Sequence, residues 1–107
     1  MDALEKQLEI NQLLAYYSPL LTAKQQTIMT YYYVDNYTLA EIAELESVSR
    51  NAVHDTLKKT IQKLYDYEEK LKLNDKDNQR ILIIEKALKS NDLETIYDLL
   101  DALKKVE

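Results

Sequence analysis

The sequence predicts an all-α fold, and three observations carry that prediction. The 107 residues include no glycine and one proline, so tight β-hairpin turns lose the residue that they prefer. Apolar residues recur at helical spacing along the whole chain. Two capping boxes, Thr22 with Gln25 and Thr38 with Glu41, mark helix starts. The length allows one domain over residues 1–107.

The first two helices are expected at about 2–17 and 23–33. The first should end at Ser18, because the residue before a proline avoids the α region. The Thr22 box opens the second. On its inward face we expect Ile28, Met29 and Tyr32.

Two further helices surround a short break. After a polar joint at 34–37, in which Asn36 is the best candidate for a left-handed conformation, a short helix begins at the Thr38 box. A break at 46–48 follows, and Ser49 caps a long helix that ends near residue 71. The apolar positions of this helix are Val53, Leu57, Ile61, Leu64, Tyr67 or Glu68, and Leu71. A stripe of this length favours self-association as a homodimer, unless residues 79–103 of the same chain cover it.

The remainder is expected to form a helical hairpin over 79–106. The stretch 74–78 contains no apolar residue, which predicts a solvent-exposed joint. Asn91, with Glu94 three residues later, resembles the start signal of the final helix.

The strongest local pattern lies within residues 22–64 and predicts a helix-turn-helix core. Ala43 is the small residue needed where two helices approach, Val48 is the apolar plug of the turn, and Ser49 caps the second helix. In such a motif the start of the second helix enters the major groove. The candidate nucleic-acid-binding residues are therefore Arg50, Asn51, His54, Lys58 and Lys59.

The residue types at these positions suit base recognition. Arg pairs with guanine and Asn with adenine through two hydrogen bonds, whereas Asp55 opposes phosphate. The same residues also fit a solvated helix face. Tyr31, Tyr32, Tyr33 and Tyr37 similarly allow stacking on RNA bases or, as we favour, core packing with one or two rings exposed.

These motifs resemble known families. Residues 22–64, with Leu-Ala-Glu-Ile-Ala at 39–43 and Val-Ser-Arg-Asn-Ala-Val at 48–53, resemble region 4 of bacterial sigma factors. With Tyr-Glu-Glu-Lys-Leu-Lys-Leu at 67–73 and Ala-Leu-Lys-Ser-Asn-Asp at 87–92, nearly the whole chain resembles the YlxM family. That resemblance implies a part in the bacterial signal recognition particle pathway, with the particle's protein or RNA as partner.

One position departs from the usual motif. The turn residue that is commonly Gly is Ser47 here. A positive φ costs a serine roughly 1 kcal/mol or more, so we expect a slightly remodelled turn.

Composition and charge exclude several classes. The chain has no Cys and one His, so a metal site is not expected; without Gly, phosphate loops and dinucleotide fingerprints are absent, and no cofactor is expected. No nucleophile lies beside a base, so we predict no catalytic residue and no enzyme. No apolar run is long enough for a membrane span, and the start lacks signal-peptide features. We expect a cytoplasmic protein.

Net charge separates the functional hypotheses. It is −5 overall, which disfavours strong autonomous binding to phosphate, although residues 50–63 hold four bases and only one acid. The first hypothesis is a non-enzymatic accessory or regulatory protein of the signal recognition particle pathway. The alternative is a sequence-specific DNA-binding transcriptional regulator, and a purely structural oligomer ranks last.

Overall fold

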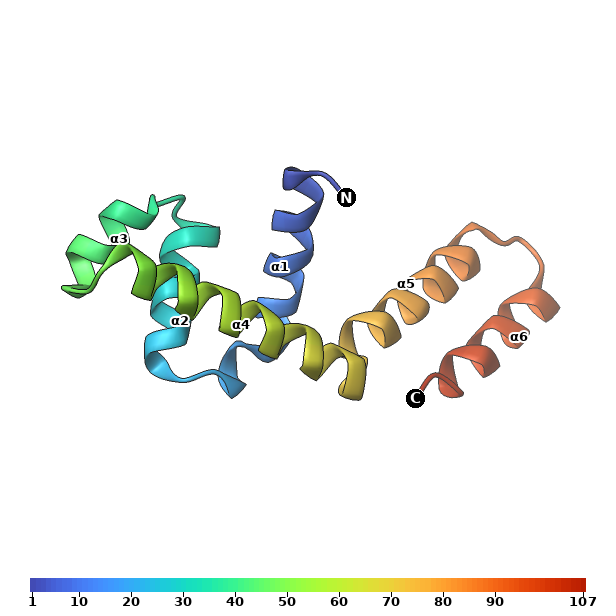
Figure 1. Cartoon of the computed structure of the whole chain (residues 1–107). Coiled ribbons are helices and arrows are strands. Elements are labelled where there is room, and N and C mark those ends of the chain that lie inside the picture. Colours follow the sequence, from blue (N-terminus) through green and yellow to red (C-terminus); the bar gives the residue numbers. More distant parts are fainter. The chain divides into compact units, whose positions relative to one another are not determined.

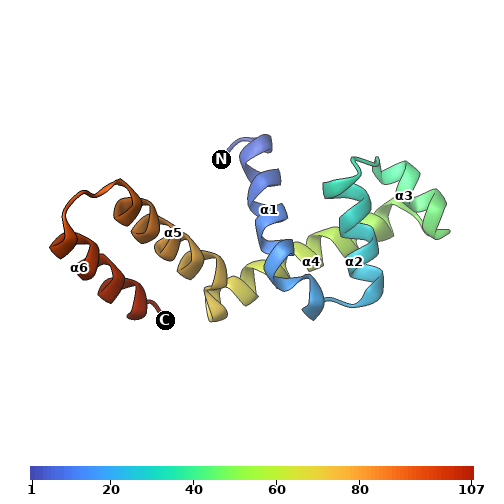
Figure 2. The ribbon, with the colours of Figure 1, turned by 180° about the vertical axis from the view of Figure 1, so that it is seen from behind.

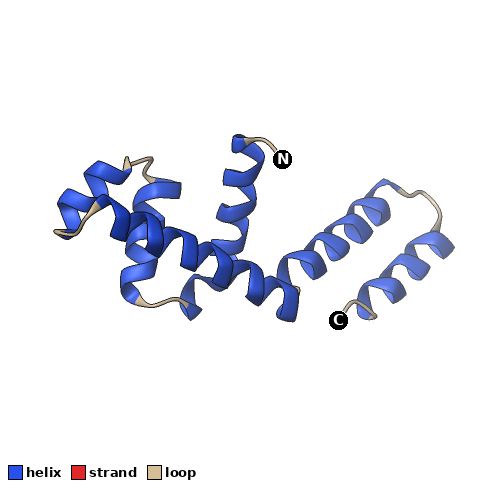
Figure 3. Cartoon of the chain, viewed as in Figure 1, coloured by secondary structure: helices blue, strands red, loops and turns tan.

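The computed structural model describes all 107 residues, which form helices and loops only (Figures 1 and 3). The all-α class expected from the sequence is confirmed. The elements in chain order are α1 (Ala3–Tyr17), the 3₁₀ turn η1 (Ser18–Leu20), α2 (Ala23–Met29), the π-helical turn η2 (Thr30–Val34), α3 (Leu39–Glu46), α4 (Arg50–Leu71), α5 (Leu73–Lys89) and α6 (Leu93–Lys104).

The chain divides into two compact units, where the length had suggested one domain over 1–107. The first unit is Met1–Leu71 and contains every buried residue; the second is Lys72–Glu107 and contains the hairpin α5–α6. The boundary falls at Lys72, whose φ of 55° is left-handed. That conformation interrupts the run of right-handed helix between α4 and α5.

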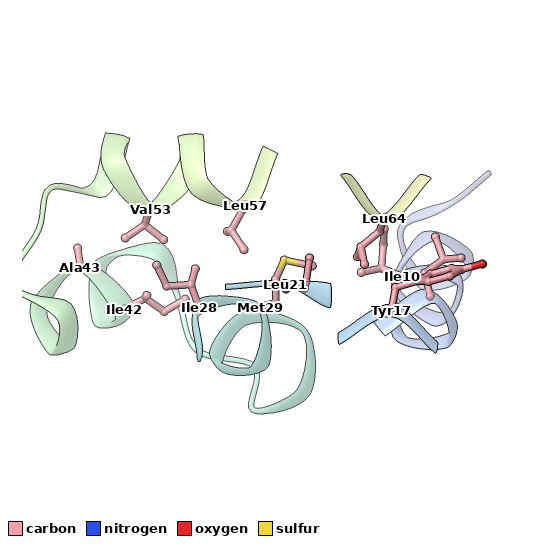
Figure 4. Packing of buried hydrophobic residues seen from close by; sticks show 11 residues of the cluster. Ile10, Tyr17, Leu21, Ile28, Met29, Ile42, Ala43, Val53, Leu57 and Leu64 are labelled. Carbon is pink, nitrogen blue, oxygen red and sulfur yellow. The ribbon is translucent and has the colours of Figure 1, made fainter. Parts of the chain in front are cut away.

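The first unit is organised around α4, which contacts α1, α2 and α3. Figures 1 and 2 show α2 and α3 beside the early turns of α4, with α1 beside its later turns. Val53, Leu57 and Leu64 line one face of α4 and are buried (Figure 4). The residues buried against them are Ile10, Leu13, Tyr17, Leu21, Ile28, Met29, Ile42 and Ala43. The apolar stripe of α4 is thus covered by its own unit as far as Leu64.

Two tyrosine–carboxylate hydrogen bonds hold α1 on α4. The Tyr17 hydroxyl donates to Glu68 Oε1 at 2.6 Å, and the Tyr65 hydroxyl donates to Glu9 Oε2 at 2.7 Å. Tyr17 is fully buried. Burial and the bond to Glu9 raise the pKa of Tyr65 to about 12. The acceptor in both bonds is a carboxylate, and a hydrogen bond to a charged acceptor is stronger than one between neutral groups.

The π-helical turn η2 changes which tyrosine faces the core. The helical spacing predicted Tyr32 on the inward face, four residues after Ile28, and this prediction is wrong. Tyr32 is exposed, while Tyr31 and Tyr33 pack against the core. The reason is the wider turn, in which the Asp35 amide donates to the Thr30 carbonyl five residues back at 2.9 Å. In a π-helical turn the hydrogen bond spans five residues and not the four of an α-helix, so the residue that follows Ile28 on the inward face is Tyr33 and not Tyr32.

The expected helix starts in the first unit are confirmed. Both capping boxes, Thr22 with Gln25 and Thr38 with Glu41, are present. Ser49 Oγ accepts the Ala52 amide hydrogen bond at 3.0 Å. Asn36 is left-handed, with φ of 60°.

The hairpin differs from its prediction at two points. Residues 74–78 are helical, so α5 begins at Leu73 and not near 79. Local pairs stabilise this first turn, because Gln79 donates to Asp75 and Arg80 to Asp77, each at 3.0 Å. The cap of α6 is Asp92, which accepts from Thr95, one residue after the predicted Asn91.

The second unit buries no residue within itself. Ile83, Ile96, Leu99 and Leu103 are half-buried. Other apolar side chains of this unit are exposed, most of all Leu88 at 81% and Leu93 at 68%. Two helices of 17 and 12 residues offer too little core for independent stability. This unit therefore leaves much of its apolar surface uncovered.

We predict that the Tyr65–Glu9 bond makes stability depend on pH in the alkaline range. The pKa of Tyr65 rises from 10.0 to about 12 on folding, so its contribution is complete below pH 10 and is lost as the pH rises to about 12. Tyr65→Phe should lower the free energy of unfolding by about 1 kcal/mol at neutral pH, and this deficit should vanish towards pH 12. Urea unfolding followed by circular dichroism measures it.

The matched control is Tyr97→Phe, because Tyr97 lies in α6 and is 66% exposed. Its stability should follow the wild type at every pH. A Tyr65→Phe deficit that is unchanged between pH 8 and pH 12 would contradict the assigned role of the bond.

Candidate nucleic-acid interface

The joint between α3 and α4 is a Schellman turn closed by a serine. Ser47 has φ of 55° and ψ of 44°, which is the left-handed region. The Val48 amide donates to the Ala43 carbonyl at 3.0 Å and the Ser47 amide to the Glu44 carbonyl at 3.3 Å, which are the two bonds that define the motif. The turn is therefore built as a Gly-containing turn would be, and the expected remodelling is not observed.

Buried small and branched side chains hold α3 against α4. Ala43 is 7% exposed, and Ile42 and Val53 are fully buried (Figure 4). Val48 is partly buried and packs against the same cluster. Because the two helices meet through these residues, the opposite face of the first turns of α4 is left towards solvent. The roles predicted for Ala43 and Val48 match these positions.

All five predicted binding residues are exposed on α4, but they do not form one set. Arg50, Asn51 and His54 line a common hollow, and His54 with Lys58 borders another. On an ideal helix Lys59 lies about 100° around the axis from Lys58, with Asp55 between them. Lys59 lines none of these hollows.

Two further charged residues of this helix behave differently. Lys63 is half-buried, and its Nζ donates to Gln25 Oε1 of the first capping box at 3.3 Å. Asp55 lies beside His54 with 4.0 Å between Oδ1 and Nδ1, and both side chains are largely exposed. An exposed pair at this distance contributes little, so it does not restrain either side chain.

Residues from α1 and η2 also reach this surface, although no local pattern in the sequence predicted them there. A hollow of about 820 Å³ beside the start of α4 is lined by Lys6 of α1, Tyr32 of η2, Asn36 and Arg50, among others. Lys6 and Tyr32 also line the hollow that contains His54 and Lys58. No local pattern marks Lys6, because it reaches this surface only through the packing of α1 on α4.

The chemistry of the remaining side chains is limited. No group of three or more His, Cys, Asp and Glu residues is arranged to hold a metal ion. Glu68, half of an acidic pair with Glu69, accepts the Tyr17 hydrogen bond between α1 and α4. No helix has the combined length and apolar character needed to cross a membrane.

A helix, a tight left-handed turn and a second helix with an exposed basic N-terminal face define a helix-turn-helix protein. A family model described as "Putative helix-turn-helix protein, YlxM / p13 like" matches residues 4–104. The chain belongs to this family, UPF0122. The family is one of helix-turn-helix proteins, and no enzymatic family is indicated.

Relatives from several bacteria cover almost the whole chain. The UPF0122 protein YlxM of Bacillus subtilis is 42% identical over 109 residues, covering 98% of this chain and 99% of the relative. A UPF0122 protein of Bacillus licheniformis is 44% identical, over 97% of this chain and 98% of the relative. One from Oceanobacillus iheyensis is 40% identical, over 97% and 99%.

We predict that Ser47→Gly stabilises the protein. Glycine adopts the left-handed conformation without the clash that a Cβ atom causes, so the free energy of unfolding should rise by about 1 kcal/mol. The measurement is urea denaturation at neutral pH. Ser47→Ala keeps the Cβ atom and should show no gain, which separates the backbone effect from loss of the hydroxyl. A Ser47→Gly variant less stable than the wild type would contradict this account of the turn.

Proposed function

We propose that this chain is a non-enzymatic regulatory protein that binds nucleic acid through the first turns of α4. One observation supports this above all: Arg50, Asn51, His54 and Lys58 are exposed together at the start of the second helix of the motif. That is the part of a helix-turn-helix that meets base edges and phosphates. Arg and Asn add the capacity for paired hydrogen bonds to guanine and adenine.

The physiological role that we propose is that of an accessory protein in the bacterial signal recognition particle pathway. The support is the resemblance of nearly the whole chain to the YlxM family, and the partner would be the particle's protein or RNA. Such a partner places the chain in the cytoplasm. The net charge of −5 favours an accessory protein over one that binds nucleic acid strongly by itself, because few basic side chains are available to neutralise phosphates.

A second candidate is a sequence-specific transcriptional regulator acting on duplex DNA. Arg50 and Asn51 favour it, since both occupy exposed positions at the very start of α4. The two candidates differ in the ligand that should bind more tightly, structured particle RNA or a DNA duplex. A single titration series compares them.

We predict that Arg50→Ala combined with Lys58→Ala weakens nucleic-acid binding more than tenfold. Loss of one good contact to a nucleobase costs about 1 kcal/mol or more, and removing two positive charges from the surface that faces the phosphates should also flatten the dependence of affinity on salt. Fluorescence anisotropy with random duplex DNA and with signal recognition particle RNA, at several salt concentrations, measures both quantities.

The matched control for this pair is Lys24→Ala with Lys86→Ala, which removes the same charge at exposed positions in α2 and α5. Affinity should then fall less than threefold. If the wild type binds neither ligand at low salt, nucleic-acid binding is refuted. A pull-down from a bacterial lysate, with and without nuclease, then asks whether the targeting GTPase is retained through protein contacts alone.

We further propose that the chain is a homodimer, and that the hairpin α5–α6 is its interface. The long stripe on α4 no longer supports an α4 interface, because α1, α2 and α3 cover it to Leu64. The hairpin, in contrast, buries none of its residues by itself. Two hairpins packed together would form a four-helix bundle, and residues 72–107 carry seven bases and eight acids, so two copies repel little.

We predict a mass of twice the chain's 12.6 kDa for the wild type and of one chain for Leu88→Asp. Leu88 is 81% exposed in α5, and a carboxylate there would have to be desolvated at the interface. Light scattering on a sizing column gives the mass. Leu4→Asp, at the 66% exposed Leu4 of α1, should remain dimeric. A monomeric wild type at high concentration would refute the dimer.

A further inference from the structure

Three hollows of the first unit join into one surface beside the predicted recognition face. The hollow of about 820 Å³ and the hollow that contains Lys58 share Lys6 and Tyr32. The third hollow, which contains Arg50 and His54, shares Leu39 with both of them. We call this surface the tyrosine groove; among the residues that line it are Lys6, Tyr32, Leu39, Arg50, His54 and Lys58. It brings α1, η2, α3 and α4 together within the single compact unit.

The tyrosine groove is electrostatically one-sided. Lys6, Arg50 and Lys58 contribute positive charge and His54 a titratable ring. No Asp or Glu lines any of the three hollows, although the chain has 19 acids against 14 bases. A concave surface that carries basic side chains and no acidic side chains attracts an anion.

An aromatic ring is presented at the same place. Tyr32 is 36% exposed and lines two of the hollows. It packs edge-on against Tyr33, with 5.0 Å between ring centroids and 75° between planes. Tyr33 is half-buried against the core, so it restrains Tyr32. The π-helical turn produces this arrangement, since an ordinary α-helical turn would have placed Tyr32 inward.

An anion site with an exposed restrained ring fits an unpaired nucleotide. The nucleobase stacks on an aromatic side chain, while the phosphates contact nearby basic side chains. A paired base cannot do this, because both of its faces are occupied within the duplex. Arg50, His54 and Lys58 belong to the tyrosine groove and also to the face that we propose for duplex contact.

We propose that the tyrosine groove binds an unpaired nucleotide adjacent to a duplex, as at a bulge or a strand junction. The inference rests on the proposed function of α4 and specifies the form of nucleic acid that it prefers. The duplex lies against the start of α4, and the unpaired base stacks on Tyr32 with Lys6 close to its phosphate. Neither a plain duplex nor a plain single strand satisfies both parts of this surface.

The test compares a labelled duplex that is fully paired with the same duplex carrying one unpaired adenosine. Both are made as RNA and as DNA, and affinity is measured by fluorescence anisotropy. Stacking one base on an aromatic side chain is worth roughly tenfold in affinity, so the wild type should bind the bulged duplex about tenfold more tightly. The RNA and DNA arms identify which sugar the site prefers.

Variants assign the preference to the tyrosine groove. Tyr32→Ala should abolish it and leave affinity for the paired duplex within about twofold, whereas Tyr32→Phe keeps the ring and should retain it. Lys6→Ala should weaken the bulged complex more than the paired one. The matched control is Lys24→Ala, which removes an exposed lysine of α2 outside the tyrosine groove; it should behave as the wild type.

The outcomes separate the two proposals. Equal affinity of the wild type for paired and bulged duplexes overturns this inference and leaves duplex binding by α4 intact. A bulge preference that survives in Tyr32→Ala overturns it as well. Absence of binding to either ligand at low salt removes the proposed nucleic-acid function itself, and this inference with it.

Discussion

Burial of one face of α4 is the constraint on which the first unit depends. Val53, Leu57 and Leu64 are almost completely excluded from solvent, and α1, α2 and α3 all pack on the face that they define. Removal of this much apolar surface from water is the largest favourable contribution to folding. Because one face of α4 must point inward, its opposite face must point outward, and this holds Arg50, Asn51, His54 and Lys58 in solvent.

Polar contacts then determine where the neighbouring helices lie on α4. The Tyr17–Glu68 and Tyr65–Glu9 bonds join α1 to its later turns, and Lys63 reaches the cap of α2. Apolar burial has little directionality, whereas a hydrogen bond demands a particular distance and angle. These bonds therefore fix the position of α1 along α4, and this position brings Lys6 to the same hollow as Arg50.

The left-handed and π-helical positions show how a chain without glycine makes its sharp joints. Asn36, Ser47 and Lys72 all have φ near 60°, each between two helices, and each carries the Cβ penalty that glycine would avoid. In the motif, the two Schellman bonds of the Ser47 turn help to offset that penalty. The π-helical turn shifts the helical register by one residue without any special residue type, and a tyrosine becomes exposed as a result.

The sequence by itself determined the features that depend on neighbours within a few residues. The all-α class, both capping boxes, the left-handed Asn36 and the helix-turn-helix over 39–53 follow from short-range hydrogen bonding and periodicity, and so do the exposed positions at the start of α4. Only the tertiary structure decided that Tyr32 faces out, that Lys6 joins Arg50 and Lys58, and that residues 72–107 form a separate unit. These depend on contacts between segments far apart in the chain, whose geometry is set by packing and not by any local pattern.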